Sequence, residues 1–274
     1  MTNDFIASAA QLACLLEASA PKPGNVSPGR NFSDASYEDF LASAAAIGPA
    51  LASDLALGAM IHAAIRATHQ WTRSNTNLGL VLLLAPLARA ARFAARSSLP
   101  LEDAVHDVLA NTTVEDAREV YAAIRLARPG GLGTASEQDV TAEPTIPLTD
   151  AMRLAYAHDS IAMEYAASYP ITFKVGLPAV LAARAQGMSW EDTTVRTFLD
   201  ILSAVPDTHV ERKFGKGVAV DVSNEVERAR RGGPEEIASF DRSLRQRGIN
   251  PGTTADLTAA ALYVALLTGA WDSR

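Results

Sequence analysis

The stretch that most constrains the fold is residues 74–87, which read SNTNLGLVLLLAPL. Its second half, residues 78–87, is apolar on every side of a helix except at Gly79 and Pro86. A helix that is apolar all round lies inside a protein rather than along its surface. We therefore predict an all-α fold, a single-domain multi-helix bundle over residues 1–274 around a buried central helix at about 78–97.

The first half of this stretch is polar. Ser74, Asn75, Thr76 and Asn77 are short side chains of the kind that accept hydrogen bonds from the free N–H groups at a helix start. The positive end of the helix dipole attracts anions, so this start is a candidate phosphate site. The alternative is a well-capped core helix without a ligand.

Composition narrows the class of protein. Hydrophobic residues make up 48% of the chain but aromatic residues only 6%, and small aliphatic side chains let helices pack closely. The formal net charge of −7 argues against a nucleic-acid partner. Cys14 is the only cysteine, which excludes an intramolecular disulfide, and its apolar neighbours predict an inert core thiol.

The sequence predicts a cytoplasmic protein without a membrane partner. Its first residues, MTNDF, lack the basic start of a secretory signal. The continuous apolar run at 78–84 is shorter than a bilayer span.

Three prolines, two glycines and two cations occupy residues 21–36, after a first predicted helix at about 4–18. Prolines stiffen a loop, and glycines let its backbone approach a ligand. Lys22 and Gly24 are therefore candidate phosphate-binding residues, and Asp34 is a nearby acid.

Residues 205–221 are predicted to form a second polar loop, with the densest group of cations in an acidic chain. Arg212 and Lys213 are its candidates for binding a polyphosphate, and Asp207 is its acid. A solvated surface turn is the alternative interpretation.

The last apolar helix, from about residue 252, begins with Gly252 and Thr254 and carries Asp256 in what we predict to be its first turn.

The other polar features are less specific. Residues 128–148 are predicted to be irregular, a mobile connection or a lid. His158 and Asp159 are predicted to lie in the middle of a helix, where aspartate is unfavourable and suggests a functional role. Lys174 falls in a predicted loop with strand-like character at 169–177. A charged helical hairpin at 222–246 is predicted to face solvent.

Five blocks together resemble the motifs of the triphosphoribosyl-dephospho-CoA synthase family, in order and at similar separations. They are PKPGNVSP from Pro21, SNTNLG from Ser74, HDSIAMEY from His158, PDTHVERKFG from Pro206 and NPGTTADLTAAALY from Asn250. The resemblance covers nearly the whole chain. It implies an all-α enzyme that transfers a triphosphoribosyl group from ATP to the ribose 2′-hydroxyl of dephospho-CoA and releases adenine.

Such a reaction needs cations for the phosphates and a carboxylate at the reacting centre. By the resemblance, Asp256 or Asp159 is the catalytic carboxylate. ATP is the substrate, and Mg²⁺ is expected with it, carried by Asp34, Asp159 or Asp207. The expected substrate-binding or phosphate-binding residues are Lys22, Gly24, Asn75, Thr76, Lys174, Arg212, Lys213, Gly252 and Thr254. The partners are small nucleotide and coenzyme substrates; the oligomeric state is open, a homodimer being one option.

The chain departs from the bacterial synthases at one instructive point. Their central helix opens with Asn-Thr-His-Lys-Gly, whereas Asn77 and Leu78 stand here in place of the histidine and lysine. This pattern is similar to a divergent branch found in archaea and in methylotrophs that use tetrahydromethanopterin. One alternative is therefore phosphoribosyl transfer to a pterin-coenzyme precursor, and another is a helical protein that binds a nucleotide or coenzyme without catalysis.

Overall fold

The computed structural model describes residues 1–32, 35–131 and 133–271. Over these residues the regular structure is helical and no strand forms, which confirms the all-α prediction. Contacts divide the chain into two compact units: unit 1 is Met1–Leu15 with Glu38–Pro170, and unit 2 is Leu16–Tyr37 with Ile171–Arg274. The single domain over 1–274 stays a prediction, and each unit is described by itself.

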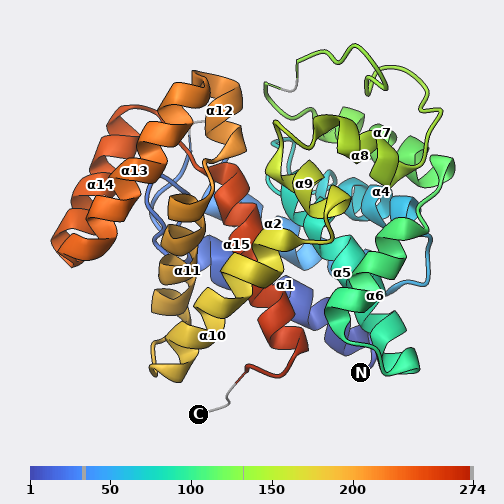
Figure 1. Cartoon of the computed structure of the whole chain (residues 1–274), viewed down its shortest axis with the longest axis horizontal. Helices are drawn as coiled ribbons and strands as arrows, with labels where there is room; N and C mark the ends of the chain where they lie inside the picture. The colour runs from blue at the N-terminus through green and yellow to red at the C-terminus, as the bar shows by residue number, and fades with distance from the viewer. Residues whose placement is uncertain (33–34, 132, 272–274) are drawn as a thin grey trace. The chain divides into compact units, whose positions relative to one another are not determined.

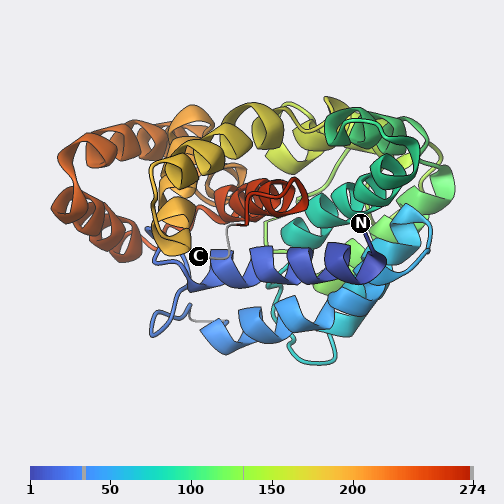
Figure 2. The same cartoon turned by 90° about the horizontal axis from the view of Figure 1, so that it is seen from below.

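Unit 1 contains the helices of the first two thirds of the chain (Figure 1). Figure 2 shows α1 along its full length, with its C-terminal end belonging to unit 2. The helices are α1 (Asn3–Ser19), α2 (Tyr37–Ala46), α3 (Gly48–Ala52), α4 (Leu57–Thr68), α5 (Leu78–Ser97), α6 (Leu101–Ala110), α7 (Val114–Ala127), α8 (Leu148–Ala155) and α9 (Ser160–Ala166).

Helix α5 is the core helix of unit 1 and has the predicted bounds. By length and composition alone it could cross a membrane, but 72% of that apolar window is buried inside the protein. Helices α4 and α6 pack against it. The core position explains the apolar sequence, because each side of α5 has protein to contact.

Pro86 lies inside α5 and would leave a buried carbonyl without a partner. Proline has no N–H, so the carbonyl of Leu82, four residues earlier, loses its usual helical donor. The hydroxyl of Tyr165 donates to this carbonyl at 2.7 Å, and the hydroxyl of Tyr169 donates to the carbonyl of Leu83, also at 2.7 Å. Both tyrosines are fully buried, and burial raises the pKa of each hydroxyl, which keeps it protonated as a donor.

Helices α4 and α7 approach closely at Gly58. A β-carbon on Gly58 would lie 2.5 Å from the backbone of Asp116, so only glycine fits. The Asp116 side chain accepts a hydrogen bond from the Gly58 N–H at 2.8 Å and forms a capping box with Thr113 at the start of α7. Helix α3 ends at Ala52, and the extended backbone of Ser53 separates it from α4.

Residues 128–148 are irregular, as predicted, and are hydrogen-bonded to α7 in the part that the structure describes. The hydroxyl of Tyr121 donates to the Gln138 carbonyl at 2.5 Å, and Arg125 donates to the Val140 carbonyl at 2.6 Å. The Asp139 carboxylate organises the turn by accepting from the Ala135 N–H at 2.7 Å and from the Thr141 hydroxyl at 2.6 Å. A lid function stays a prediction.

Unit 2 is built around a second apolar helix, α15 (Gly252–Leu267), which is buried on nearly all sides. Packed against it are the π-helix η1 (Thr172–Gly176), α10 (Leu177–Ala185), α11 (Trp190–Ala204) and α12 (Thr208–Phe214). The structure thus corrects two predictions. The strand-like loop at 169–177 contains a π-helix, and the loop at 205–221 contains α12 and the start of the next helix.

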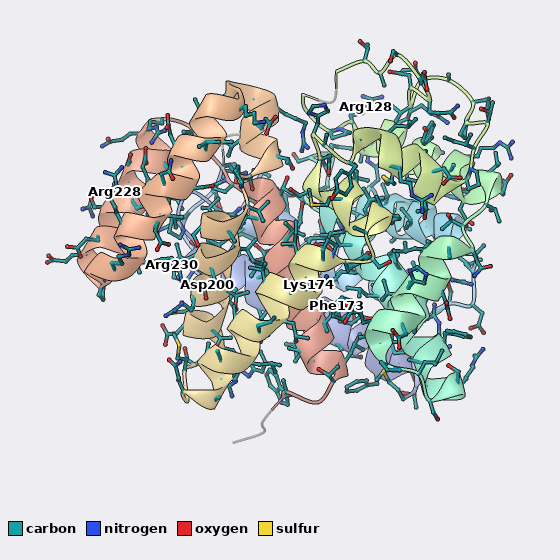
Figure 3. All side chains as sticks on the ribbon, in the orientation of Figure 1. Arg128, Phe173, Lys174, Asp200, Arg228 and Arg230 are labelled. Atoms are coloured by element: carbon teal, nitrogen blue, oxygen red, sulfur yellow. The ribbon has the colours of Figure 1, made fainter. Side chains whose placement is uncertain are left out.

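Helices α13 (Lys216–Gly232) and α14 (Pro234–Gln246) run side by side in unit 2 (Figure 1). Their apolar faces and that of α11 share a core cluster that includes Phe198, Val222 and Phe240. Arg230 of α13 forms an ion pair with Asp200 of α11, both labelled in Figure 3. The hairpin is therefore a packed part of the unit, with only its outer face exposed.

Candidate functional site

Asp207 joins two helix starts in unit 2. Its Oδ1 atom accepts from the Val210 N–H at 2.9 Å and so caps α12. Its Oδ2 atom accepts both the N–H and the hydroxyl of Thr254, in the first turn of α15, at 2.7 Å each. Burial raises the pKa of the Asp207 carboxyl, and these hydrogen bonds and the charge of Arg212 oppose that effect.

The start of α15 therefore already has an anion beside it. We predicted that its N–H groups and Thr254 would bind phosphate, but the carboxylate of Asp207 takes this place. The same contacts occupy Asp207, so its geometry favours a structural role over the predicted metal role. Thr208 and Thr253 reinforce the junction through a hydroxyl–hydroxyl bond of 3.2 Å.

Two side chains, those of His209 and Asn250, lie against the first residue of α15. A β-carbon at Gly252 would lie 3.5 Å from the His209 ring and 3.6 Å from the Asn250 amide. Asp256 is half-buried and lies one residue beyond the first turn of α15, which corrects the predicted position. His209, Asn250 and Asp256 give this end of the helix a polar, partly accessible surface.

The 21–30 loop reaches the same helix start. The Asn25 amide donates to the Asn250 side-chain oxygen at 2.9 Å. Gly24 has φ of +71°, and a β-carbon there would lie 2.8 Å from the Ile249 carbonyl, so the loop backbone needs glycine. The Gly24 N–H donates to Asp241, which leaves that donor unavailable for the predicted phosphate contact.

Lys22 is completely buried. Its ammonium lies 3.0 Å from the Glu17 carboxylate and also donates to the carbonyls of Glu17 and Ala20. Burial lowers the pKa of Lys22 and raises that of Glu17, while the attraction between the two opposes both shifts. An ammonium enclosed in this way holds the loop to the end of α1, and the geometry does not support the predicted phosphate contact.

Three of the predicted phosphate-binding cations are accessible and lie on helices of unit 2. Arg212 and Lys213 are in the last turn of α12, with Arg212 half-buried and Lys213 exposed. Lys174 is exposed on η1, where Figure 3 labels it. Because the charge of Arg212 acts on Asp207, Arg212 lies close to the junction of α12 and α15. These three cations stay candidates for binding phosphate.

In unit 1 the predicted cap at the start of α5 is only partly present. The Asn75 side-chain oxygen accepts from the Leu78 N–H at 3.2 Å, as a cap does. The Thr76 hydroxyl is buried and lies 2.5 Å from the Ser43 hydroxyl, while the Asn77 amide donates to Thr68. Asn75 is thus an exposed cap, and Thr76 belongs to the packing of α2. Their substrate contacts stay predictions.

Asp159 does not lie in the middle of a helix. It is the N-cap of α9, where its Oδ1 atom accepts from the N–H groups of Ile161 and Ala162 at 2.8 and 3.2 Å. This correction explains why aspartate occurs there without requiring catalysis. Its predicted catalytic and metal roles stay untested.

Magnesium stays an expectation that accompanies ATP, since Mg²⁺ is usually held by one or two carboxylates together with substrate phosphates. The described residues contain no group of three or more His, Cys, Asp or Glu side chains placed to hold a metal ion. Asp34, one of the predicted ligands, lies outside the described residues.

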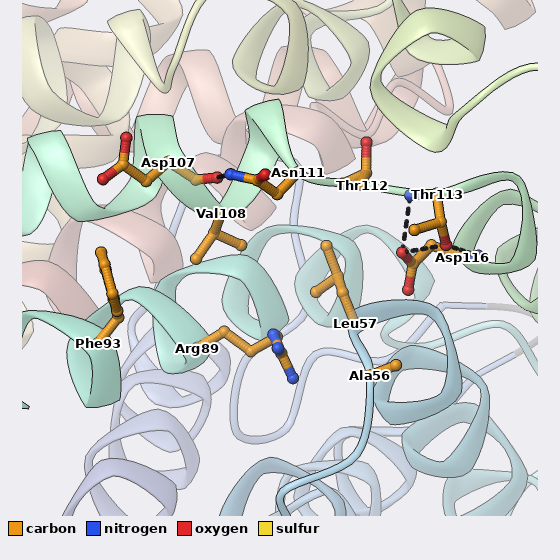
Figure 4. Close-up of a pocket in the computed structure, with 10 residues that line it drawn as sticks. All are labelled: Ala56, Leu57, Arg89, Phe93, Asp107, Val108, Asn111, Thr112, Thr113 and Asp116. Atoms are coloured by element: carbon orange, nitrogen blue, oxygen red, sulfur yellow. Dashed lines mark hydrogen bonds between the residues drawn. The ribbon is translucent and has the colours of Figure 1, made fainter.

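A pocket of about 400 Å³ lies in unit 1, and no residue of the five motif blocks is among the residues that line it (Figure 4). Leu57, Val108 and Phe93 form its apolar part, and Arg89 and Asp107 bring one charge of each sign. None of the predicted site residues lines it. Its size alone does not make it the reactive centre, because a binding site also needs convergent polar groups and none of the motifs contributes one to its lining.

The sequence interpretation missed Asp241. The charged hairpin was predicted to face solvent, yet Asp241 of α14 is 7% exposed and accepts hydrogen bonds from the 21–30 loop. A signal was present in its spacing to Arg245, four residues later, but such pairs also occur on fully solvated helices. Asn250 and His209 lay inside the quoted motifs without being singled out.

The described residues form an all-α fold, and comparison with known proteins identifies the class of protein and its family. The family model for ATP:dephospho-CoA triphosphoribosyl transferase matches residues 3–274. The chain belongs to this family of transferases.

A solved structure is similar to the chain over most of its length. It is a proposed triphosphoribosyl-dephospho-CoA synthase from Archaeoglobus fulgidus, 28% identical, with a TM-score of 0.68. The match covers 84% of this chain and 99% of that one. No curated protein matches the sequence.

Proposed function

We propose that the protein transfers the triphosphoribosyl group of ATP to the 2′-hydroxyl of dephospho-CoA. The bond between the ribose C1 and adenine breaks, and a bond from C1 to the acceptor oxygen forms. Adenine leaves with the proton that the acceptor hydroxyl gives up, so the atoms balance. Membership of the family supports this reaction.

The observation that carries the proposal for unit 2 is the meeting of three motif blocks at the start of α15. The Asn25–Asn250 bond joins the first block to the last, and the Asp207–Thr254 bonds join the fourth to the last. Residues that are far apart in sequence are thereby held against one helix start. Such convergence of rigidly held polar groups is what positioning a substrate requires.

We assign roles according to burial. Asp256, half-buried beside this junction, is the proposed carboxylate at the reacting centre, where it stabilises positive charge on the ribose or takes the acceptor proton. Arg212, Lys213 and Lys174 are the proposed phosphate-binding cations. Asp207, Thr254 and Lys22 hold the backbone in place. Magnesium enters only as the expected counter-ion of ATP.

A pterin-coenzyme precursor remains the second candidate acceptor. In the structure Leu78 is buried and the Asn77 amide is bonded to Thr68, so this part of unit 1 has no cation where the bacterial synthases have lysine. A changed set of cations is compatible with a changed acceptor. Cytoplasmic location and the absence of nucleic-acid and membrane partners stay expectations.

The test is adenine release from ATP, measured by chromatography with dephospho-CoA, with the pterin precursor, or with neither, and the product mass determined. We expect release that depends on dephospho-CoA. Release only with the pterin precursor would replace the acceptor, and no release with either would contradict the proposed transfer.

Variants at the cations refine this test. Arg212→Ala and Lys213→Ala should each raise the KM for ATP about 10- to 100-fold, the loss expected for a charge-assisted contact. Arg228→Ala, at an exposed position on α13, is the matched control and should leave KM unchanged.

A further inference from the structure

Asp241 of α14 is a hydrogen-bonding centre for the 21–30 loop. Its Oδ1 atom accepts from the Gly24 N–H at 2.8 Å, and its Oδ2 atom accepts from the Arg30 guanidinium at 3.0 Å. Asp241 lies in none of the five motif blocks, yet its carboxylate contacts residues more than 200 positions earlier in the chain. It therefore fixes the position of the loop rather than the local helix.

Arg245, one turn later on α14, makes a second attachment. Its Nε atom donates to Asp241 at 2.9 Å, while its terminal nitrogen donates to the Asn25 carbonyl at 2.6 Å. The planar guanidinium thus holds the carboxylate and the loop backbone at once, which the single ammonium of lysine does less well. Asp241 and Arg245 together hold Gly24 and Asn25 in place by hydrogen bonds.

A further hydrogen bond connects Asn25 to the start of α15. The Asn25 amide, whose backbone carbonyl Arg245 holds, donates to the Asn250 side chain at 2.9 Å. The Asn250 side chain lies 3.6 Å from the β-carbon position of Gly252, the first residue of α15. A shift of Asn25 would therefore displace Asn250 beside the proposed reacting centre.

We propose that Asp241 and Arg245 are positioning residues for this reaction, which act through Gly24 and Asn25 on the start of α15. This inference rests on the proposed function. The two residues touch no substrate; they set the place of the loop and of Asn250. Misplacement of positioning groups by about 1 Å can reduce rates about 100-fold without unfolding a protein.

The experiment compares Arg245→Met, Arg245→Lys and the control Arg242→Met, a change at an exposed position on the same helix. The kcat and KM of adenine release are measured for each variant, together with thermal unfolding. We expect Arg245→Met to lower kcat/KM about 10- to 100-fold. Arg245→Lys should recover part of the loss, and Arg242→Met should match the parent protein. Folded Arg245→Met with the parent's kcat/KM would overturn the proposal.

Amide hydrogen exchange at Gly24 tests the inference without activity. The Gly24 N–H should exchange slowly in the parent protein and at least about tenfold faster in Arg245→Met and in Asp241→Asn, since each weakens the attachment. Unchanged protection would contradict the positioning role. A parent protein that releases no adenine would refute the proposed function, while the exchange result would still decide the attachment. If Arg245→Met does not fold, Arg245→Lys and Asp241→Asn carry both measurements.

Discussion

The Oδ2 atom of Asp207 accepts two hydrogen bonds from Thr254, one from its N–H and one from its hydroxyl, each at 2.7 Å. Both residues are buried, so the carboxylate depends on these donors in place of water. Thr254→Val keeps the shape of the side chain but removes the hydroxyl. We expect it to lower the free energy of unfolding in urea by about 1–3 kcal/mol.

Thr254→Ser is the matched control because it keeps the donor. It should lower the free energy of unfolding less than Thr254→Val does, mainly because serine lacks the methyl group of threonine. If valine is tolerated as well as serine, the hydroxyl bond from Thr254 to Asp207 does not help to hold the two helix starts together.

Lys22 and Glu17 form a buried ion pair, and removing one partner should lower the stability of the fold. Glu17→Leu leaves a buried ammonium without its counter-charge, so we expect a loss of about 3–5 kcal/mol. The double variant Glu17→Leu with Lys22→Met removes both charges and should recover much of that stability, measured by denaturant unfolding. It should also keep the parent KM for ATP. A large rise in KM would instead favour the original prediction that Lys22 binds phosphate.

Tyr165 should stabilise the protein chiefly because Pro86 removes a helical donor. Tyr165→Phe leaves the Leu82 carbonyl buried without a partner, with an expected cost of about 1–3 kcal/mol. Pro86→Ala restores an N–H that can donate to that carbonyl. The Phe substitution should therefore cost less in the Pro86→Ala background. Equal costs in the two backgrounds would show that the tyrosine and the proline are not coupled.

Asp139 gives a prediction of how the stability of its turn depends on pH. Hydrogen bonds from the Thr141 hydroxyl and from the Ala135 and Thr141 N–H groups lower its pKa from 3.8 to about 2. A lowered pKa in the folded state means that the carboxylate favours the folded turn above pH 3.8. This contribution is lost as the pH falls through about 2. An NMR titration of the Asp139 carboxyl carbon should give this value, and Thr141→Val should raise it. A pKa near 3.8 in the parent protein would mean that the turn does not form.

Local patterns predicted the elements whose stability is local. The apolar run predicted the bounds of α5, because they depend on neighbours within a few residues. Helix α12 was missed since Pro206 and Gly215 made its segment resemble a loop. In the structure Gly215, with φ of +90°, only separates α12 from α13.

The roles of site residues were harder to predict, because a polar residue gives the same sequence signal whether it binds a ligand or another part of the chain. Asp159 interrupted an apolar pattern, and only the backbone geometry distinguishes its capping role from the predicted position inside a helix. Lys22 looked like a ligand in a glycine-containing loop. Its partner, Glu17, was visible as an acid at the end of an apolar helix, but their pairing required the turn between them.

The most direct measurement for the central claim is the initial rate of dephospho-CoA-dependent adenine release by the parent protein and by Asp256→Asn at saturating ATP. We expect the parent protein to release adenine and the variant, with unchanged thermal unfolding, to lose at least about 100-fold in kcat. Equal rates in the two proteins, or no release by the parent, would contradict the assignment of the reacting centre to the start of α15.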